Sequence, residues 1–315
     1  MAAPPTSPAR KTRDDLIAER RVRKEARTAN ARARERARNQ AWADKEKARA
    51  ERAKTPRPWL LRWLPRRRLA VVYDVAGAKV RFGVLWFLAN LAGLSVGLEV
   101  MTPLYVITAG TAGLQASRAW RRRGTSVHRM AAGVGAGLLP LAASVSVGFL
   151  GVAILLVVGV AYYVALIDLE GGNPLNQASY TVQCALFPGM AAAGVVLTLR
   201  YDLIAAAGLI LLVSAYDSGD FLIGSGSRRR WEGPAIGIIA VMVMAFAISS
   251  LRLPPFVLPE ALYLGGMAAV LCPIGQLVAS AVLPDAAVRA PAVRRLDSLM
   301  VLAPVWALVI GILTV

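Results

Sequence analysis

The chain has 315 residues, 56% of them hydrophobic and seven of them tryptophan. This composition excludes a soluble domain with a single anchor and indicates a polytopic membrane protein. The net charge of +18 is unevenly spread, because the first 70 residues hold 22 Lys and Arg against 8 Asp and Glu. Most of the charge therefore belongs to an N-terminal tail and says little about the membrane body.

Residues 1–55 predict a basic cytoplasmic tail that is solvated, helical or disordered, because they favour helix but lack an apolar stripe. No apolar signal-peptide core is present, so the N-terminus is expected in the cytoplasm. Only Trp42 interrupts the basic run, which disfavours nucleic acid as a partner. Residues 56–81 predict a juxtamembrane interfacial segment, since tryptophan and leucine alternate with arginine from 56 to 69.

Residues 82–315 predict an all-α transmembrane bundle of about nine helices. Gly, Ala and Ser are abundant at 131–148 and 189–208, which favours close helix packing. The apolar runs lie at about 82–98, 100–117, 131–148, 149–167, 181–199, 203–216, 234–251, 260–283 and 298–315.

Arginine clusters predict the orientation of this bundle. Counting nine spans from a cytoplasmic N-terminus places the C-terminus outside and three arginine-bearing loops inside, in agreement with the positive-inside rule. We expect a multi-pass protein of the inner (plasma) membrane. The loops on the cytoplasmic side would be 118–130, 168–180, 217–233 and 284–297. The acidic stretch at 168–177 is the exception, and the sequence leaves open whether it is re-entrant or faces a substrate.

The sequence does not indicate a functional role for the two cysteines or the single histidine. Cys184 and Cys272 lie in separate apolar runs and predict neither a disulfide nor a metal site. His128 is expected to be a loop residue, which leaves a Ser-His-Asp triad poorly supported.

The stretch 214–233 is the most informative, because it places charges between two apolar runs: Asp217, Asp220, Glu232, Arg228, Arg229 and Arg230. Ionisable groups at a bilayer boundary need a partner, and a phosphate-rich, metal-bound ligand would supply one. The simpler alternative is a short cytoplasmic loop that follows the positive-inside rule.

Four sequence fragments in this half of the chain resemble the CDP-diacylglycerol synthases, also called phosphatidate cytidylyltransferases. Their motifs read D-x-x-A-Y-x-x-G, S-P-K-K-T-W-E-G, G-D-L-x-E-S-x-x-K-R and P-G-H-G-G-x-x-D-R-x-D-S-L. The matching positions are Asp217, Ser218, Gly219, Phe221 and Gly224; Ser227, Arg229, Arg230, Trp231, Glu232 and Gly233; Gly275, Leu277 and Ser280; and Arg295, Leu296, Asp297, Ser298 and Leu299. The fragments occur in the family's order, and the resemblance covers residues 180–315.

The resemblance implies transfer of a cytidylyl group from CTP to phosphatidate, with pyrophosphate leaving and Mg²⁺ and basic side chains stabilising the phosphates. The candidate catalytic residues are Asp217 and Asp297. With Asp220 they are also the candidates for a relocated magnesium site, because other residues occupy the positions where the family holds its metal. The implied substrate-binding residues are Ser227, Arg228, Arg229, Arg230, Glu232, Arg295 and Ser298.

Two departures from the family's motifs argue against catalytic activity in this chain. Gln276 and Arg294 occupy the positions where the family carries metal-binding carboxylates, and neither an amide nor a guanidinium is a suitable magnesium ligand. Two hypotheses follow: an active enzyme with a rearranged site, or a non-catalytic paralogue that binds anionic lipid or scaffolds membrane partners. The sequence contains no pattern typical of secondary transporters or of CDP-alcohol phosphotransferases. It does not decide whether the protein forms a homodimer.

Overall fold

The computed structural model describes residues 77–168, 173–224, 231–285 and 288–314. All of them belong to one unit of the chain, residues 65–315. The predicted tail (1–55) and residues 56–76 of the predicted interfacial segment lie outside the described residues.

Regular structure in the described residues is entirely helical, which confirms the predicted all-α class for this part of the chain. The helices are α2 (Gly77–Val96), α3 (Leu98–Arg121), α4 (Arg129–Val145), α5 (Val147–Ile167), α6 (Pro174–Tyr201), α7 (Leu203–Gly224), α8 (Glu232–Ser249), α9 (Glu260–Val282), α10 (Pro291–Arg295) and α11 (Leu299–Leu313). Each predicted apolar run overlaps one of the longer helices.

Several helices have the length and composition of membrane spans. Helices α5, α6, α7, α8 and α9 are long and apolar enough to cross a bilayer, while Gly83–Val96, Arg129–Val145 and Leu299–Leu313 are shorter apolar helices. These helices indicate a membrane-embedded protein. The count of nine spans and their orientation stay predictions.

Several predicted boundaries are wrong. Helix α6 begins at Pro174, seven residues before the predicted start at residue 181, and two further errors concern charged residues. Helix α7 was expected to end at residue 216, but it continues to Gly224, so Asp217 and Asp220 are helical and not in a loop. The helix continues because the residues after Tyr216 contain no proline and include three apolar side chains near its end. Likewise α3 continues through Arg118 to Arg121, past the predicted end at residue 117.

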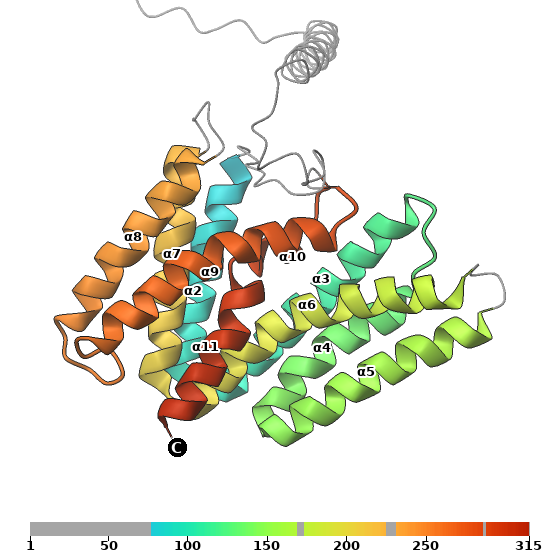
Figure 1. Ribbon diagram of the computed structural model, residues 1–315, viewed down its shortest axis with the longest axis horizontal. Coiled ribbons are helices and arrows are strands. Elements are labelled where there is room, and N and C mark those ends of the chain that lie inside the picture. The colour runs from blue at the N-terminus through green and yellow to red at the C-terminus, as the bar shows by residue number, and fades with distance from the viewer. Residues whose placement is uncertain (1–76, 169–172, 225–230, 286–287, 315) are drawn as a thin grey trace, which may run out of the picture. The chain divides into compact units, whose positions relative to one another are not determined.

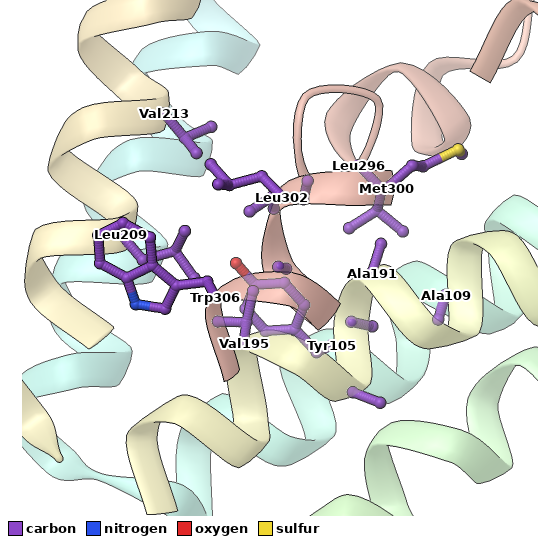
Figure 2. Close-up of a cluster of buried hydrophobic side chains, with 14 of the residues drawn as sticks. Tyr105, Ala109, Ala191, Val195, Leu209, Val213, Leu296, Met300, Leu302 and Trp306 are labelled. Atoms are coloured by element: carbon purple, nitrogen blue, oxygen red, sulfur yellow. The ribbon is translucent and has the colours of Figure 1, made fainter. Parts of the chain in front are cut away.

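The helices form two groups joined by α11. Helices α3, α4, α5 and α6 pack against one another, and α7, α8 and α9 pack in succession. Helix α11 contacts both α6 and α9, and α2 contacts both α3 and α7 (Figure 1). Figure 2 shows the apolar cluster around α11, where Leu302 and Trp306 lie among side chains of α6 and α7 such as Val195 and Leu209.

Glycine and alanine allow the helices of this core to approach closely, as the sequence predicted. A Cβ on Gly194 of α6 would lie 2.5 Å from the carbonyl oxygen of Ala303 in α11. A Cβ on Gly189 would lie 2.9 Å from the carbonyl oxygen of Ala136 in α4. Because both obstacles are backbone atoms, helix α6 would have to move to admit a larger side chain.

We expect Gly194→Ala to destabilise the bundle by about 1–3 kcal/mol, the usual cost of overpacking a core. The measurement is the apparent melting temperature of the purified protein in detergent, which should fall by several degrees. Gly159→Ala is the matched control, because a Cβ on this glycine of α5 would meet nothing within 4 Å. Equal melting temperatures for the two variants would contradict the close α6–α11 contact.

Candidate functional site

A polar cluster forms where α7, α9 and the connection between α10 and α11 meet. A glycine makes this meeting possible, because a Cβ on Gly275 of α9 would overlap the carbonyl oxygen of Asp297 and lie 3.0 Å from that of Ser298. On the other side of α7, a Cβ on Gly237 of α8 would lie 2.7 Å from the ring of Tyr216. The backbone of α9 is therefore held directly against the residues that precede α11.

The first part of the cluster is a chain of hydrogen bonds centred on Gln276. The hydroxyl of Tyr216 donates to Oε1 of Gln276 at 3.2 Å, and Nε2 of Gln276 donates to Oδ2 of Asp220 at 3.0 Å. All three residues are buried. An amide can accept from a hydroxyl and donate to a carboxylate at the same time, whereas an ionised Asp at position 276 could only accept.

The second part of the cluster joins Asp217 to the residues before α11. The hydroxyl of Ser298 donates to Oδ1 of Asp217 at 2.5 Å, and the backbone N–H of Ser298 donates to Oδ1 of Asp297 at 2.9 Å. Asp220 lies one helical turn after Asp217 on α7, and Ser298 links Asp217 to Asp297. The structure thus brings together the three aspartates that the sequence singled out.

Two arginines of α10 face these carboxylates. Nη1 of Arg294 donates to Oγ of Ser280 at 3.3 Å and lies 4.0 Å from Oδ2 of Asp297. Burial lowers the pKa of the Arg295 guanidinium, while Asp217 and Asp297 oppose this shift. An arginine with nearby carboxylates stays protonated, so the chain itself supplies fixed positive charge to the site.

Helix α3 and the residues just after it hold the α9–α10 connection in place, through side chains that no sequence pattern singled out. The amide oxygen of Gln115 accepts the backbone N–H of Ala292 at 2.9 Å, in the first turn of α10. The indole N–H of Trp120 donates to the carbonyl oxygen of Val282 at 2.8 Å. Arg123 pairs with Asp285 at 3.0 Å. The sequence signal that could have identified these residues is the presence of a glutamine and a tryptophan near the end of an apolar run.

The remaining predicted residues fall into two classes. Ser227, Arg228, Arg229 and Arg230 lie outside the described residues, so their roles stay predictions. Glu232 lies in the first turn of α8, where a negative charge is favourable for the helix dipole.

His128, Cys184 and Cys272 have structural positions. Nδ1 of His128 accepts the backbone N–H of Ala131 at 3.1 Å and so caps α4. Both cysteines are buried and unpaired, and the two thiols therefore lie away from solvent.

The carboxylates of the cluster are engaged within the protein. Among the residues that the structure describes, no group of three or more His, Cys, Asp or Glu side chains is placed to hold a metal. Oxygens of Asp217, Asp220 and Asp297 already accept hydrogen bonds, and the Arg294 guanidinium lies beside Asp297. The metal site expected from Asp217, Asp220 and Asp297 stays a prediction.

Comparisons with known proteins do not identify a family for the chain. No family model matches it, and no significant match was found among curated proteins. The similarity to CDP-diacylglycerol synthases thus depends on the residues of the four motif fragments alone.

We expect Gln276→Leu to lower stability by about 1–3 kcal/mol, because the Tyr216 hydroxyl and the Asp220 carboxylate would each lose a buried partner. Thermal unfolding in detergent measures the effect. Leu277→Ala on the same helix is the control, since Leu277 is exposed on the bundle surface and makes no such contact. A Gln276→Leu protein as stable as the control would show that the hydrogen-bonded chain contributes nothing.

Proposed function

We propose that this chain is a membrane protein of phospholipid metabolism that resembles phosphatidate cytidylyltransferases and binds phosphatidate or another anionic phospholipid at the polar cluster. In this proposal catalysis is impaired. One observation carries it: the guanidinium of Arg294 lies beside Asp297 and Ser280, at the position where the family's motif has a metal-binding carboxylate.

The chemistry of the cluster supports phosphate binding. Arginine can hold a phosphate through two parallel hydrogen bonds, and Arg294 and Arg295 are adjacent at the end of α10. Over residues 217–230 and 294–297 the sequence contains five arginines and three aspartates. In this proposal the arginines at 228–230 add to the charge of Arg294 and Arg295, and the ligand carries at least two negative charges.

A second candidate is an active cytidylyltransferase with a rearranged site. It is favoured by the closeness of Asp217 to Asp220 and Asp297, which interact electrostatically. In that case the three aspartates would hold Mg²⁺, Arg228 to Arg230 would bind the triphosphate of CTP, and the ion would stabilise charge on the transferred phosphoryl group.

Membrane placement belongs to the same proposal. We infer an inner (plasma) membrane location, with the N-terminus and the polar cluster on the cytoplasmic side, where CTP would be found. Support comes from the arginines on one set of loops, such as Arg122 and Arg123 after α3.

The deciding experiment incubates the purified protein with CTP, phosphatidate and Mg²⁺ and reads CDP-lipid by mass spectrometry. We expect no CDP-lipid or only a trace, together with retained binding of phosphatidate and much weaker binding of phosphatidylcholine. Turnover at ordinary enzyme rates, about 1–10³ per second, that Asp217→Ala abolishes would overturn the binding proposal and favour the second candidate.

Binding itself is tested with Arg295→Gln, which removes one positive charge from the cluster. We expect phosphatidate affinity in nanodiscs to fall at least several-fold, measured against wild type by native mass spectrometry. Arg122→Gln is the matched control, because Arg122 is an exposed arginine just after α3 and lies outside the cluster. Equal losses in both variants would point to general charge attraction and contradict a specific site.

Magnesium affinity gives an independent prediction. The double variant Gln276→Asp with Arg294→Asp should bind Mg²⁺ more tightly than wild type, because each change supplies the hard oxygen ligand that magnesium prefers. Each single variant should increase the Mg²⁺ affinity less than the double variant does. Isothermal titration with Mg²⁺ measures the change, and an unchanged affinity in the double variant would refute the assignment of these two positions.

A further inference from the structure

The loop between α8 and α9 differs in composition from the connection between α3 and α4. Residues 250–259 read SLRLPPFVLP and contain one charged side chain, Arg252. The connection from α3 to α4 carries Arg122, Arg123 and His128 over a similar length. A loop that faces water is expected to be polar, so the composition of residues 250–259 indicates surroundings less polar than water.

One side chain fixes this loop to the bundle. Phe256 is fully buried, and its ring occupies the space beside Gly208 of α7 that a Cβ would need. The ring centroid of Phe256 lies 6.1 Å from that of Trp306 in α11. The backbone N–H of Phe256 also donates to the carbonyl oxygen of Leu253 at 2.7 Å. The loop therefore has a defined conformation around an internal anchor.

The other large apolar side chains of the loop point away from the core. The exposed fractions are 64% for Leu251, 44% for Leu253, 41% for Val257 and 51% for Leu258. Exposed apolar residues continue from the loop onto both flanking helices, at Phe246 of α8 and Leu262 of α9. Four such side chains on so short a loop are unfavourable in water, because burial of each would release free energy.

Helix lengths place the loop at the membrane boundary. Helix α8 has 18 residues, which span about 27 Å, slightly less than the hydrocarbon core of about 30 Å. Exposed Trp231 precedes α8, and exposed Tyr263 lies in the first turn of α9. Tryptophan and tyrosine concentrate at the two membrane interfaces. With Trp231 at one interface, α8 ends at or just inside the opposite boundary of the hydrocarbon.

The same helices separate the loop from the polar cluster. Gln276 lies 16 residues beyond Glu260, the first residue of α9, which corresponds to about 24 Å along the helix. The loop and the cluster therefore belong to opposite leaflets.

We propose that residues 251–258 insert into the leaflet opposite the polar cluster, where Leu251, Leu253, Val257 and Leu258 contact lipid at the boundary between acyl chains and headgroups. The occupant of this surface is lipid and not a protein partner, because the exposed residues are continuous with the outer faces of two candidate membrane spans. Arg252 extends its guanidinium from this position to the phosphate level, as arginines at membrane interfaces commonly do.

The experiment uses the full chain reconstituted in liposomes, with Leu251→Cys and Leu258→Cys as separate variants. Cys184 and Cys272 are buried, so the unsubstituted protein gives the labelling background. Arg122→Cys is the control, since residue 122 is exposed on the arginine-rich connection after α3. Each introduced cysteine is labelled with an environment-sensitive fluorophore. Its quenching is then measured with nitroxide-bearing lipids and, separately, with aqueous iodide.

We expect labels at 251 and 258 to be blue-shifted and quenched several-fold more by shallow nitroxide lipids than the label at 122. Iodide should quench the label at 122 instead. Iodide quenching at 251 and 258 equal to that at 122 would overturn the proposal. Protection from both quenchers, with crosslinks between cysteines of two copies, would identify a second copy as the occupant and would also overturn it. If Leu251→Cys does not elute as folded protein, Leu253→Cys provides the same test.

Discussion

A polar group inside a hydrocarbon-embedded bundle must find its partner within the protein, and this constraint organises the candidate site. Asp220 is satisfied by the amide of Gln276, Asp217 by the hydroxyl of Ser298, and Asp297 by the N–H of Ser298 and the nearby guanidinium of Arg294. These partners come from α7, α9 and the connection around α10, which are distant in sequence. Neutralising the carboxylates therefore also fixes how these segments dock.

Close backbone contact is the means by which these partners reach one another. Gly275 lets α9 lie against the carbonyl groups of Asp297 and Ser298, and Gly194 lets α6 lie against α11. Both contacts involve α11 or the residues just before it, and α11 is the helix that joins the two helix groups. The polar cluster and the apolar core are therefore parts of one packing arrangement and are not independent layers.

The sequence predicted the helical class and the approximate position of each helix, because an apolar run long enough to cross a bilayer satisfies its backbone hydrogen bonds there as a helix. The topology of the spans also predicted that the segments around Asp217 and Asp297 lie at one membrane face, and Ser298 links these two residues in the structure. It could not predict the end of α7, because Asp217 and Asp220 resemble loop residues when their buried partners are unknown. Gln115 and Trp120 were missed for a related reason: their partners are backbone groups of a segment more than 150 residues away.

The attachment of α10 has a mechanical consequence. Its first turn is tied to α3 through Gln115, whereas the arginines at its end face Ser280 of α9 and the carboxylate of Asp297. A five-residue helix thus bridges the two helix groups and has little length over which to absorb displacement. Any relative displacement of the two groups would therefore change the contacts at both ends of α10.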